Sequence, residues 1–365
     1  MHDEIYDDTV AALGSLAGRV CAITGTTTGT GYWTAIAAAR CSAACIMLLN
    51  RPSSRANSCK VAVQREADKN GGGFTEVVQI DCDLLSFVSV KAAATAILEK
   101  SGQHGGLDAL ICNAGIMAVP DQRTKDGFDV QMQVNHLSHF LLSKLLMPSL
   151  EAASSARGEA RIVQHSSGAR KPNKRSSRPG SDDLVAKYFE KAPAGALGGD
   201  GIGAGFARYH QTKLANLAFA MGLHKKLAAA GSKVKSCCAE PGVAKTDLTK
   251  NTARPHSFLK RRIFGAVGVL MSCSGGHIQS AADGACPLIV AAFDGRTASG
   301  DMWMPSKHIP VSALPPSPQA LLPLDHLNAE ISPEKRRKVA LLDATLCPFA
   351  PPPHQGVLGG VCCAG

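Results

Sequence analysis

The chain has 365 residues, which suffices for two average domains or for one large α/β domain with a sizeable core. Its formal net charge of +10 is compatible with a nucleic acid, an anionic membrane surface or a polyanionic cofactor as partner. The basic residues form neither an arginine-rich helix nor a ladder with aromatic residues, which argues against nucleic-acid binding.

Thirteen cysteines are scattered through apolar runs, without the paired spacing of a zinc site or of a secreted disulfide framework. We therefore expect reduced core thiols and no metal site. The acidic N-terminal segment has no signal-peptide pattern, and the apolar run at 263–271 is too short to span a bilayer. The sequence predicts an intracellular, cytoplasmic protein and leaves open organellar association and peripheral membrane contact through 260–271.

Residues 19–31 combine an apolar run with the glycine spacing G-x-x-x-G-x-G. The run suits a strand that is buried on both faces, as in a parallel sheet. Gly25, Gly29 and Gly31 then permit a tight turn that brings the backbone close to a pyrophosphate at a helix N-terminus. The stretch predicts a nucleotide-binding turn, although such a turn also occurs without a ligand.

A helix over 32–40 and a strand over 44–49 complete one β-α-β unit. Asn50 and Arg51 follow that strand, where an acidic residue would bind the ribose of an unphosphorylated adenosine. Arg51, assisted by Arg55, offers charged donors to a 2′-phosphate, which favours NADP(H) over NAD(H). A solvated loop arginine is the alternative.

The alternation of strands and helices continues along the chain. Asn135 lies inside a long predicted helix and, as a poor helix former, needs a partner or a kink there. Residues 168–208 show no periodic pattern and predict a functional or disordered loop. The expected elements are a helix over 57–70, a strand over 75–80, a helix over 87–98, a strand over 107–112, a helix over 128–150 that ends near Pro148, a strand over 161–163, a helix over 209–230, a strand over 233–238, a mobile flap over 251–280, a helix over 281–293, a strand over 299–304, a proline-rich connection over 310–323, a closing helix over 334–346 and an unstructured tail over 347–365.

Tyr209 and Lys213 are four residues apart and so share one face of a helix. An ammonium group close to a phenol favours the phenolate and lowers the tyrosine pKa from about 10 toward the range that acid–base catalysis uses. A lone Tyr-x-x-x-Lys pair is common by chance. Its meaning depends on the motifs that accompany it.

Taken together, seven motifs resemble those of the short-chain dehydrogenase/reductase family, in the family's order, over about 19–248. They are Thr24-Gly25-x-x-x-Gly29-x-Gly31, Asp83-Leu84, Asn113-Ala114-Gly115, Asn135, Ser166-Ser167, Tyr209-x-x-x-Lys213 and Pro241-Gly242. The resemblance implies an α/β, three-layer Rossmann fold with a doubly wound seven-stranded parallel sheet in the order 3-2-1-4-5-6-7. We expect one domain over 15–346, with an insert at 170–206 and a substrate flap at 251–280, between an N-terminal extension (1–14) and the tail.

The resemblance also implies roles for a catalytic tetrad. Tyr209 would be the general acid/base, and Lys213 would lower its pKa and hold the nicotinamide ribose. Ser167 would bind the substrate oxygen, and Asn135 would position a proton-relay water. The expected cofactor contacts are Gly25, Thr26, Thr28, Gly29, Thr30, Gly31, Asn50, Arg51, Asp83, Leu84, Asn113, Ala114, Gly115, Tyr209, Lys213, Pro241, Gly242, Val243 and Thr246.

Within the family, residues 135–140 and 209–216 resemble the group of retinol dehydrogenases, WW-domain oxidoreductases and light-dependent protochlorophyllide reductases. This implies an NADP(H)-dependent oxidoreductase that interconverts a carbonyl and an alcohol on a small hydrophobic substrate. A low-turnover NADP(H)-binding regulatory or redox-sensing protein is the alternative. His165, His210 and Glu240 adjoin the motifs and are expected to be structural. Family members are often dimers or tetramers, so a homo-oligomer stays open.

Overall fold

The computed structural model describes residues 4–69, 74–170, 184–242, 244, 279–305 and 321–323. Several expected features lie outside these residues: nearly all of the flap at 251–280, the closing helix at 334–346 and the tail. Within the described ranges, no helix combines the length and the apolar character needed to cross a bilayer.

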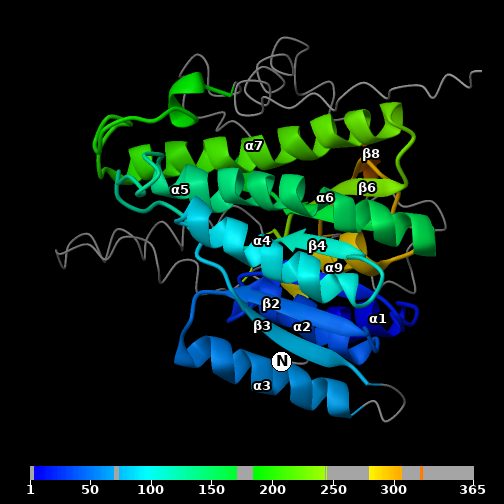
Figure 1. Cartoon of the computed structure of the whole chain (residues 1–365). Coiled ribbons are helices and arrows are strands. Elements are labelled where there is room, and N and C mark those ends of the chain that lie inside the picture. The colour runs from blue at the N-terminus through cyan, green and yellow to red at the C-terminus, as the bar shows by residue number, and fades with distance from the viewer. Residues whose placement is uncertain are drawn as a thin grey trace, which may run out of the picture.

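A single sheet forms the centre of the molecule, in the order β3-β2-β1-β4-β5-β6-β7-β8 (Figure 1). The first seven strands along the chain pair in parallel, which confirms the predicted order 3-2-1-4-5-6-7. An eighth strand pairs antiparallel to β7, within the segment expected to be a connection. The strands are β1 Val20–Thr24, β2 Cys45–Asn50, β3 Glu76–Asp81, β4 Ala109–Cys112, β5 Ala160–His165, β6 Val234–Ala239, β7 Asp301–Trp303 and β8 Leu321–Pro323.

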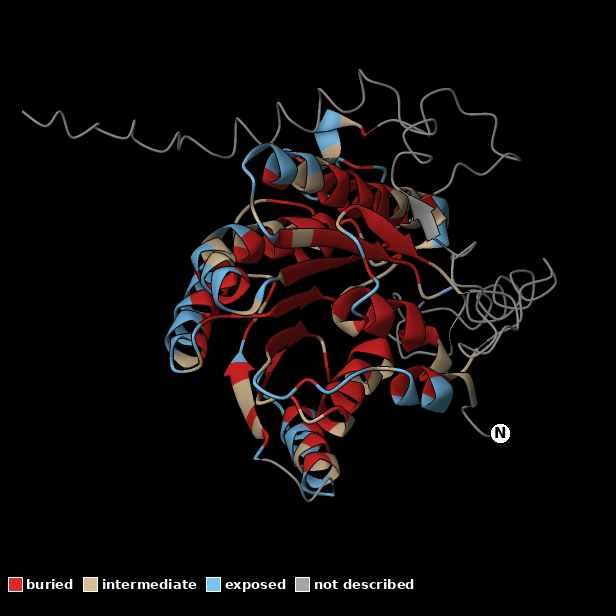
Figure 2. Ribbon diagram, turned by 90° about the vertical axis from the view of Figure 1, so that its right-hand side faces the viewer, coloured by how far each residue is buried: buried red, intermediate tan, exposed pale blue. Residues whose placement is uncertain are grey.

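Helices cover both faces of this sheet, and the central strands are buried throughout (Figure 2). Neighbouring residues of one strand point into different cores: Ile46 belongs to the core under α2 and α9, whereas Met47 belongs to the core under α4 and α6. The helices of the first face are α1 Glu4–Ala11, α2 Gly29–Arg40, α3 Ser54–Asp68 and α9 Cys286–Phe293; those of the second are α4 Phe87–Gly102, α6 Ser138–Arg157 and α7 Ile202–Ala229.

The start of α3 shows how a capping residue moves a helix boundary. The hydrophobic pattern predicts a start at Asn57, but the helix begins at Ser54. The hydroxyl of Ser53 accepts a hydrogen bond from the Ala56 amide at 3.2 Å and so satisfies one donor of the first turn. The cap therefore extends the helix by residues 54–56, which the hydrophobic pattern did not include.

The expected end of the long helix at Pro148 is wrong, because α6 continues through this proline to Arg157. A proline inside a helix costs roughly 3 kcal/mol. Beyond it, Leu150 and Ala153 are fully buried in the core under α4 and α6, and their packing outweighs that cost. Gly158 ends the helix with a φ of +89°, a conformation suited to glycine.

The helix that carries Tyr209 also begins earlier than expected, at Ile202 instead of Tyr209. Two glycines in this stretch conceal the helix in the sequence, because glycine is a poor helix former. Gly205 packs closely against a neighbouring segment: a Cβ there would lie 3.2 Å from the Cα of Ala118, which is tighter than an ordinary contact. The last part of the insert expected at 170–206 is therefore helical.

Candidate active site

The turn between β1 and α2 rests directly on the end of β4. A Cβ on Gly31 would lie 2.3 Å from Nδ2 of Asn113 and 2.4 Å from the carbonyl oxygen of Gly25, so no other residue fits there. Gly25 has a φ of +69°, and a Cβ there would lie 2.9 Å from Ala114. The glycine spacing is thus explained by close backbone packing within the turn itself.

Asn113 fastens this turn with its side-chain amide. Its Nδ2 donates to the carbonyl oxygens of Thr24 and Gly25, at 2.9 and 3.1 Å, and its Oδ1 accepts from the Thr30 hydroxyl at 2.8 Å. Both ends of the amide are therefore engaged in the scaffold. Gly115, two residues further along the chain, lies close to the catalytic residues: a Cβ there would be 3.6 Å from Nζ of Lys213.

Asn50 has a comparable role at the end of β2. It is buried; its Oδ1 accepts from the Thr26 amide at 2.9 Å and its Nδ2 donates to the Thr26 hydroxyl at 2.7 Å. The next residue, Arg51, is exposed. A hollow of about 330 Å³ lies between the turn and α3, and its lining residues are Thr27, Tyr32, Ser54, Arg55, Ser58, Cys59 and Ala62.

The start of α2 suits an anionic group. Thr28 precedes the helix in an extended conformation and makes no side-chain capping bond. The first turn of α2 also contains no acidic residue. The amides of a helix N-terminus carry partial positive charge, so this end of α2 fits the pyrophosphate of a dinucleotide.

Asn135 lies in a local widening of its helix. The short helix α5 (Val130–Met132) passes into a π-helical turn over Gln133–Leu137 before α6 begins. The sequence predicts a partner or a kink for this asparagine, and the structure supplies partners. Oδ1 of Asn135 accepts from the Ile116 amide at 2.8 Å, and Nδ2 donates to the Ile116 carbonyl at 2.9 Å and to the Thr212 hydroxyl at 3.0 Å. Asn135 therefore joins the segment after β4 to α7.

Tyr209, Lys213 and Ser167 lie together at the end of β5. The Lys213 ammonium lies 5.6 Å from the centre of the Tyr209 ring and donates to the His165 carbonyl at 2.9 Å. The side chains of Ser167 and Tyr209 form a hydrogen bond. Both Tyr209 and Lys213 are buried. The structure thus gathers a phenol, a hydroxyl and an ammonium group in one protected place.

Burial governs the ionisation of this pair. Burial raises the pKa of Tyr209 to about 12, although the hydrogen bond with Ser167 acts in the opposite direction and lowers this pKa. Burial also lowers the pKa of Lys213 to about 8. The charge of Glu240 raises the pKa of Tyr209 further, and the lowering by Lys213 that the sequence analysis expects stays a prediction.

Three histidines next to the site act as neutral supports. Burial lowers the pKa of His136 and of His139 to about 4 and that of His165 well below its usual range. His139 lies 2.9 Å from the Thr24 hydroxyl and 3.1 Å from the Asn135 carbonyl oxygen. The sequence analysis missed His139, and its position four residues after Asn135 on the same helix face is the signal that could have found it.

The remaining expected site residues that the structure describes lie at the same edge of the sheet. Asp83 and Leu84 follow β3, and the Leu84 carbonyl accepts from the Ser138 hydroxyl at 2.7 Å. Pro241 and Gly242 follow β6. Val243 and Thr246 are outside the described residues. In an open parallel sheet this carboxyl edge is where ligands bind.

Comparison with known proteins agrees with this geometry. Residues 19–177 match the family model described as short chain dehydrogenase. Human polyprenol dehydrogenase is 32% identical over 233 residues, which are 64% of this chain and 63% of that protein. The short-chain dehydrogenase/reductase drtF of Aspergillus calidoustus is 32% identical over 253 residues, or 67% of this chain and 73% of the relative. Human retinol dehydrogenase 13 is 31% identical over 256 residues, or 69% and 67%.

Solved structures share the fold. A crystal structure of a putative uncharacterized protein from Mycobacterium paratuberculosis is 26% identical, covers 92% of this chain and 93% of its own, and has a TM-score of 0.56. The 3-ketoacyl-(acyl-carrier-protein) reductase of Brucella melitensis, 20% identical with a TM-score of 0.54, covers 80% and 97% and shows the fold alone. This chain spans about 63% of the length of some curated relatives, human polyprenol dehydrogenase among them. The chain belongs to the short-chain dehydrogenase/reductase family.

Proposed function

We propose that the protein is an NADP(H)-dependent oxidoreductase that interconverts a carbonyl and an alcohol on a small hydrophobic substrate. One observation carries the proposal: the Tyr209 phenol, hydrogen-bonded to Ser167 and close to Lys213, lies at the sheet edge that also holds the glycine turn. The names of the related polyprenol and retinol dehydrogenases refer to alcohols, which supports this substrate class.

The residues divide the reaction between them. NADP(H), when bound, supplies or accepts the hydride. During reduction the Tyr209 hydroxyl donates its proton to the carbonyl oxygen, and Ser167 donates a hydrogen bond to the same oxygen. Because its pKa is raised to about 12, Tyr209 is protonated at neutral pH and ready to act as the acid.

Lys213, in α7, and Asn135, in the π-helical turn, assist Tyr209. The Lys213 ammonium is held by the His165 carbonyl and would bind the nicotinamide ribose. Asn135 fixes the segment at Ile116 against Thr212, in the turn of α7 between Tyr209 and Lys213. We assign Asn135 a positioning role for the proton path between the phenol and solvent.

The test is NADPH oxidation by the full chain against a panel of retinals, steroids, quinones, and aliphatic and aromatic aldehydes. We expect turnover with at least one bulky apolar carbonyl, at a higher kcat/KM than with a small sugar or hydroxy acid. Tight NADPH binding without turnover on any member of the panel would contradict the proposal and favour the low-turnover regulatory alternative.

A further inference from the structure

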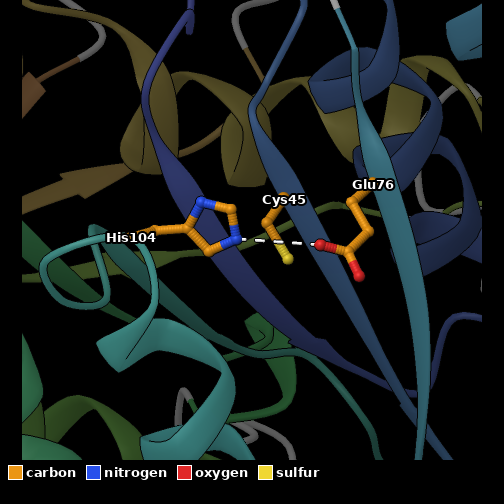
Figure 3. A group of neighbouring side chains, drawn as sticks. All are labelled: Cys45, Glu76 and His104. Carbon is orange, nitrogen blue, oxygen red and sulfur yellow. Dashed lines mark ion pairs between the residues drawn. The ribbon is translucent and has the colours of Figure 1, made fainter.

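Cys45, Glu76 and His104 meet at the amino-terminal edge of the sheet, opposite the edge that holds Tyr209 (Figure 3). Cys45 opens β2 and Glu76 opens β3, and the two are direct partners in the parallel register, so their side chains share one face of the sheet. His104 follows α4, which packs on that same face. One sulfur, one carboxylate oxygen and one imidazole nitrogen lie within 4.8 Å of one another.

The carboxylate and the imidazole are already oriented toward each other. Oε2 of Glu76 lies 3.7 Å from Nε2 of His104, while Oε1 of Glu76 is bound by the Lys100 ammonium at 2.6 Å. The backbone of His104 is fixed as well, since its amide donates to the Ser101 carbonyl at 3.0 Å and its carbonyl accepts from Arg157 at 3.0 Å. These contacts fix the Glu76 carboxylate and the backbone of His104.

The three side chains differ in how far they are exposed to solvent. The side chains of His104 and Glu76 are 27% and 32% exposed, whereas Cys45 is fully buried. A cation from solvent can therefore first contact the imidazole and the carboxylate and then bind the buried sulfur. Thiolate, imidazole and carboxylate together are ligands that Zn²⁺ accepts in tetrahedral sites.

We propose that Cys45, Glu76 and His104 bind one zinc ion, with water as the fourth ligand. On binding, the Cys45 thiol loses its proton to solvent and the sulfur forms the bond to zinc, with no change of oxidation state. The ion would tie β2, β3 and the segment after α4 together at an edge remote from catalysis. No short sequence motif reveals this group, because the three residues are far apart in the chain.

The experiment uses the full chain, freed of metal with a chelator and then titrated with Zn²⁺ in competition with a chromophoric chelator. We expect one equivalent to bind and to raise the melting temperature. Co²⁺ in place of Zn²⁺ should give a sulfur-to-cobalt charge-transfer band. Cys45→Ala and His104→Asn should each weaken Zn²⁺ binding at least about 10-fold, and Cys45→Ala should also remove the band.

Matched controls separate this site from the other cysteines and histidines. Cys41→Ala changes a buried cysteine on the other face of the sheet, and His224→Asn changes a histidine bound to Ser299; both should leave zinc binding unchanged. NADPH affinity reports folding in every variant. Absence of stoichiometric binding to the wild type would overturn the proposal, as would equal binding by the Cys45→Ala and His104→Asn variants, which would indicate an adventitious ion only.

Discussion

The Arg170 guanidinium and the Glu240 carboxylate form a buried ion pair beside the catalytic residues. Nη1 of Arg170 donates to Oε2 of Glu240 and, at 3.1 Å, to the Ser167 carbonyl oxygen. Nε and Nη2 of Arg170 have no hydrogen-bond partner among the residues that the structure describes. Since the charge of Glu240 raises the pKa of Tyr209, this carboxylate acts on the acid–base residue, a role that the sequence analysis did not assign to it.

The first prediction is that Glu240→Gln lowers the pKa of Tyr209. The alkaline rise of alcohol oxidation, which needs the phenolate, should then move to lower pH. The variant also leaves the Arg170 charge buried without its partner, which costs about 3–5 kcal/mol of unfolding free energy. The double variant Arg170→Met/Glu240→Gln should recover part of that stability. A pH profile of kcat for oxidation that is identical to wild type would contradict the effect on Tyr209.

The second prediction is that Tyr209→Phe lowers kcat for carbonyl reduction by a factor of about 10² or more, because proton donation in the transition state contributes roughly that much. NADPH affinity should stay within a few fold of wild type. Single-turnover rates and NADPH fluorescence titration measure the two effects. Retention of most turnover on a verified substrate would refute the catalytic assignment.

The third prediction separates activity from stability at Lys213. Burial lowers the pKa of its ammonium to about 8, so below pH 8 the folded chain carries a charge that its surroundings disfavour. Lys213→Met removes this charge and should abolish turnover without lowering the midpoint of urea unfolding at pH 7. A large loss of stability would mean that the hydrogen bond to His165 matters more than the burial cost.

The fourth prediction concerns two glycines with opposite surroundings. Gly31→Ala forces a Cβ against Asn113 and Gly25, so the turn must shift and NADPH binding should weaken at least about 10-fold. Gly222→Ala is the control: it lies in α7, and a Cβ there would meet no atom of the described residues within 4 Å. This control should leave NADPH affinity unchanged and stabilise the fold by about 0.5–1 kcal/mol.

Much of the fold is predictable because its signals are local. A run such as 45–49 is apolar throughout, which indicates a strand buried on both faces. Boundaries were less predictable, since the cap at Ser53 and the continuation of α6 through Pro148 depend on one side-chain bond and on distant packing. Strand β8 was missed because its three residues lie in a proline-rich stretch.

The candidate site was also predictable only in part. Motif spacing brings Asn135, Ser167, Tyr209 and Lys213 into one hypothesis, and the asparagine inside the helical pattern predicts a partner or a kink. The ionisation of the site could not be predicted, because the pKa of Tyr209 depends on burial and on a glutamate that is distant in sequence. The spacing of Tyr209 and Lys213 pointed to the lysine charge, whereas the contributions of burial, of Ser167 and of Glu240 depend on three-dimensional packing.

The proposed preference for NADP(H) rests on two arginines near the end of β2. Arg51 is exposed directly after the strand, and Arg55 lines the hollow of about 330 Å³ beside the glycine turn. Asn50 is engaged with Thr26, so it holds the turn and, being uncharged, does not repel a 2′-phosphate. A guanidinium at either position can therefore approach that phosphate with charged donors.

The last prediction follows from this arrangement. A charged hydrogen bond contributes roughly 1.5–3 kcal/mol, or about 10- to 150-fold in affinity, and the exposure of Arg51 puts its share near the lower end. Arg51→Ala and Arg55→Ala should each raise the KM for NADPH while leaving that for NADH nearly unchanged, and the double variant should lose most of the preference. Because exposed charges are screened, kcat/KM for both cofactors must be measured at one fixed ionic strength. A wild type that prefers NADH, or variants that impair both cofactors equally, would show that these arginines are solvated loop and helix residues with no part in cofactor choice.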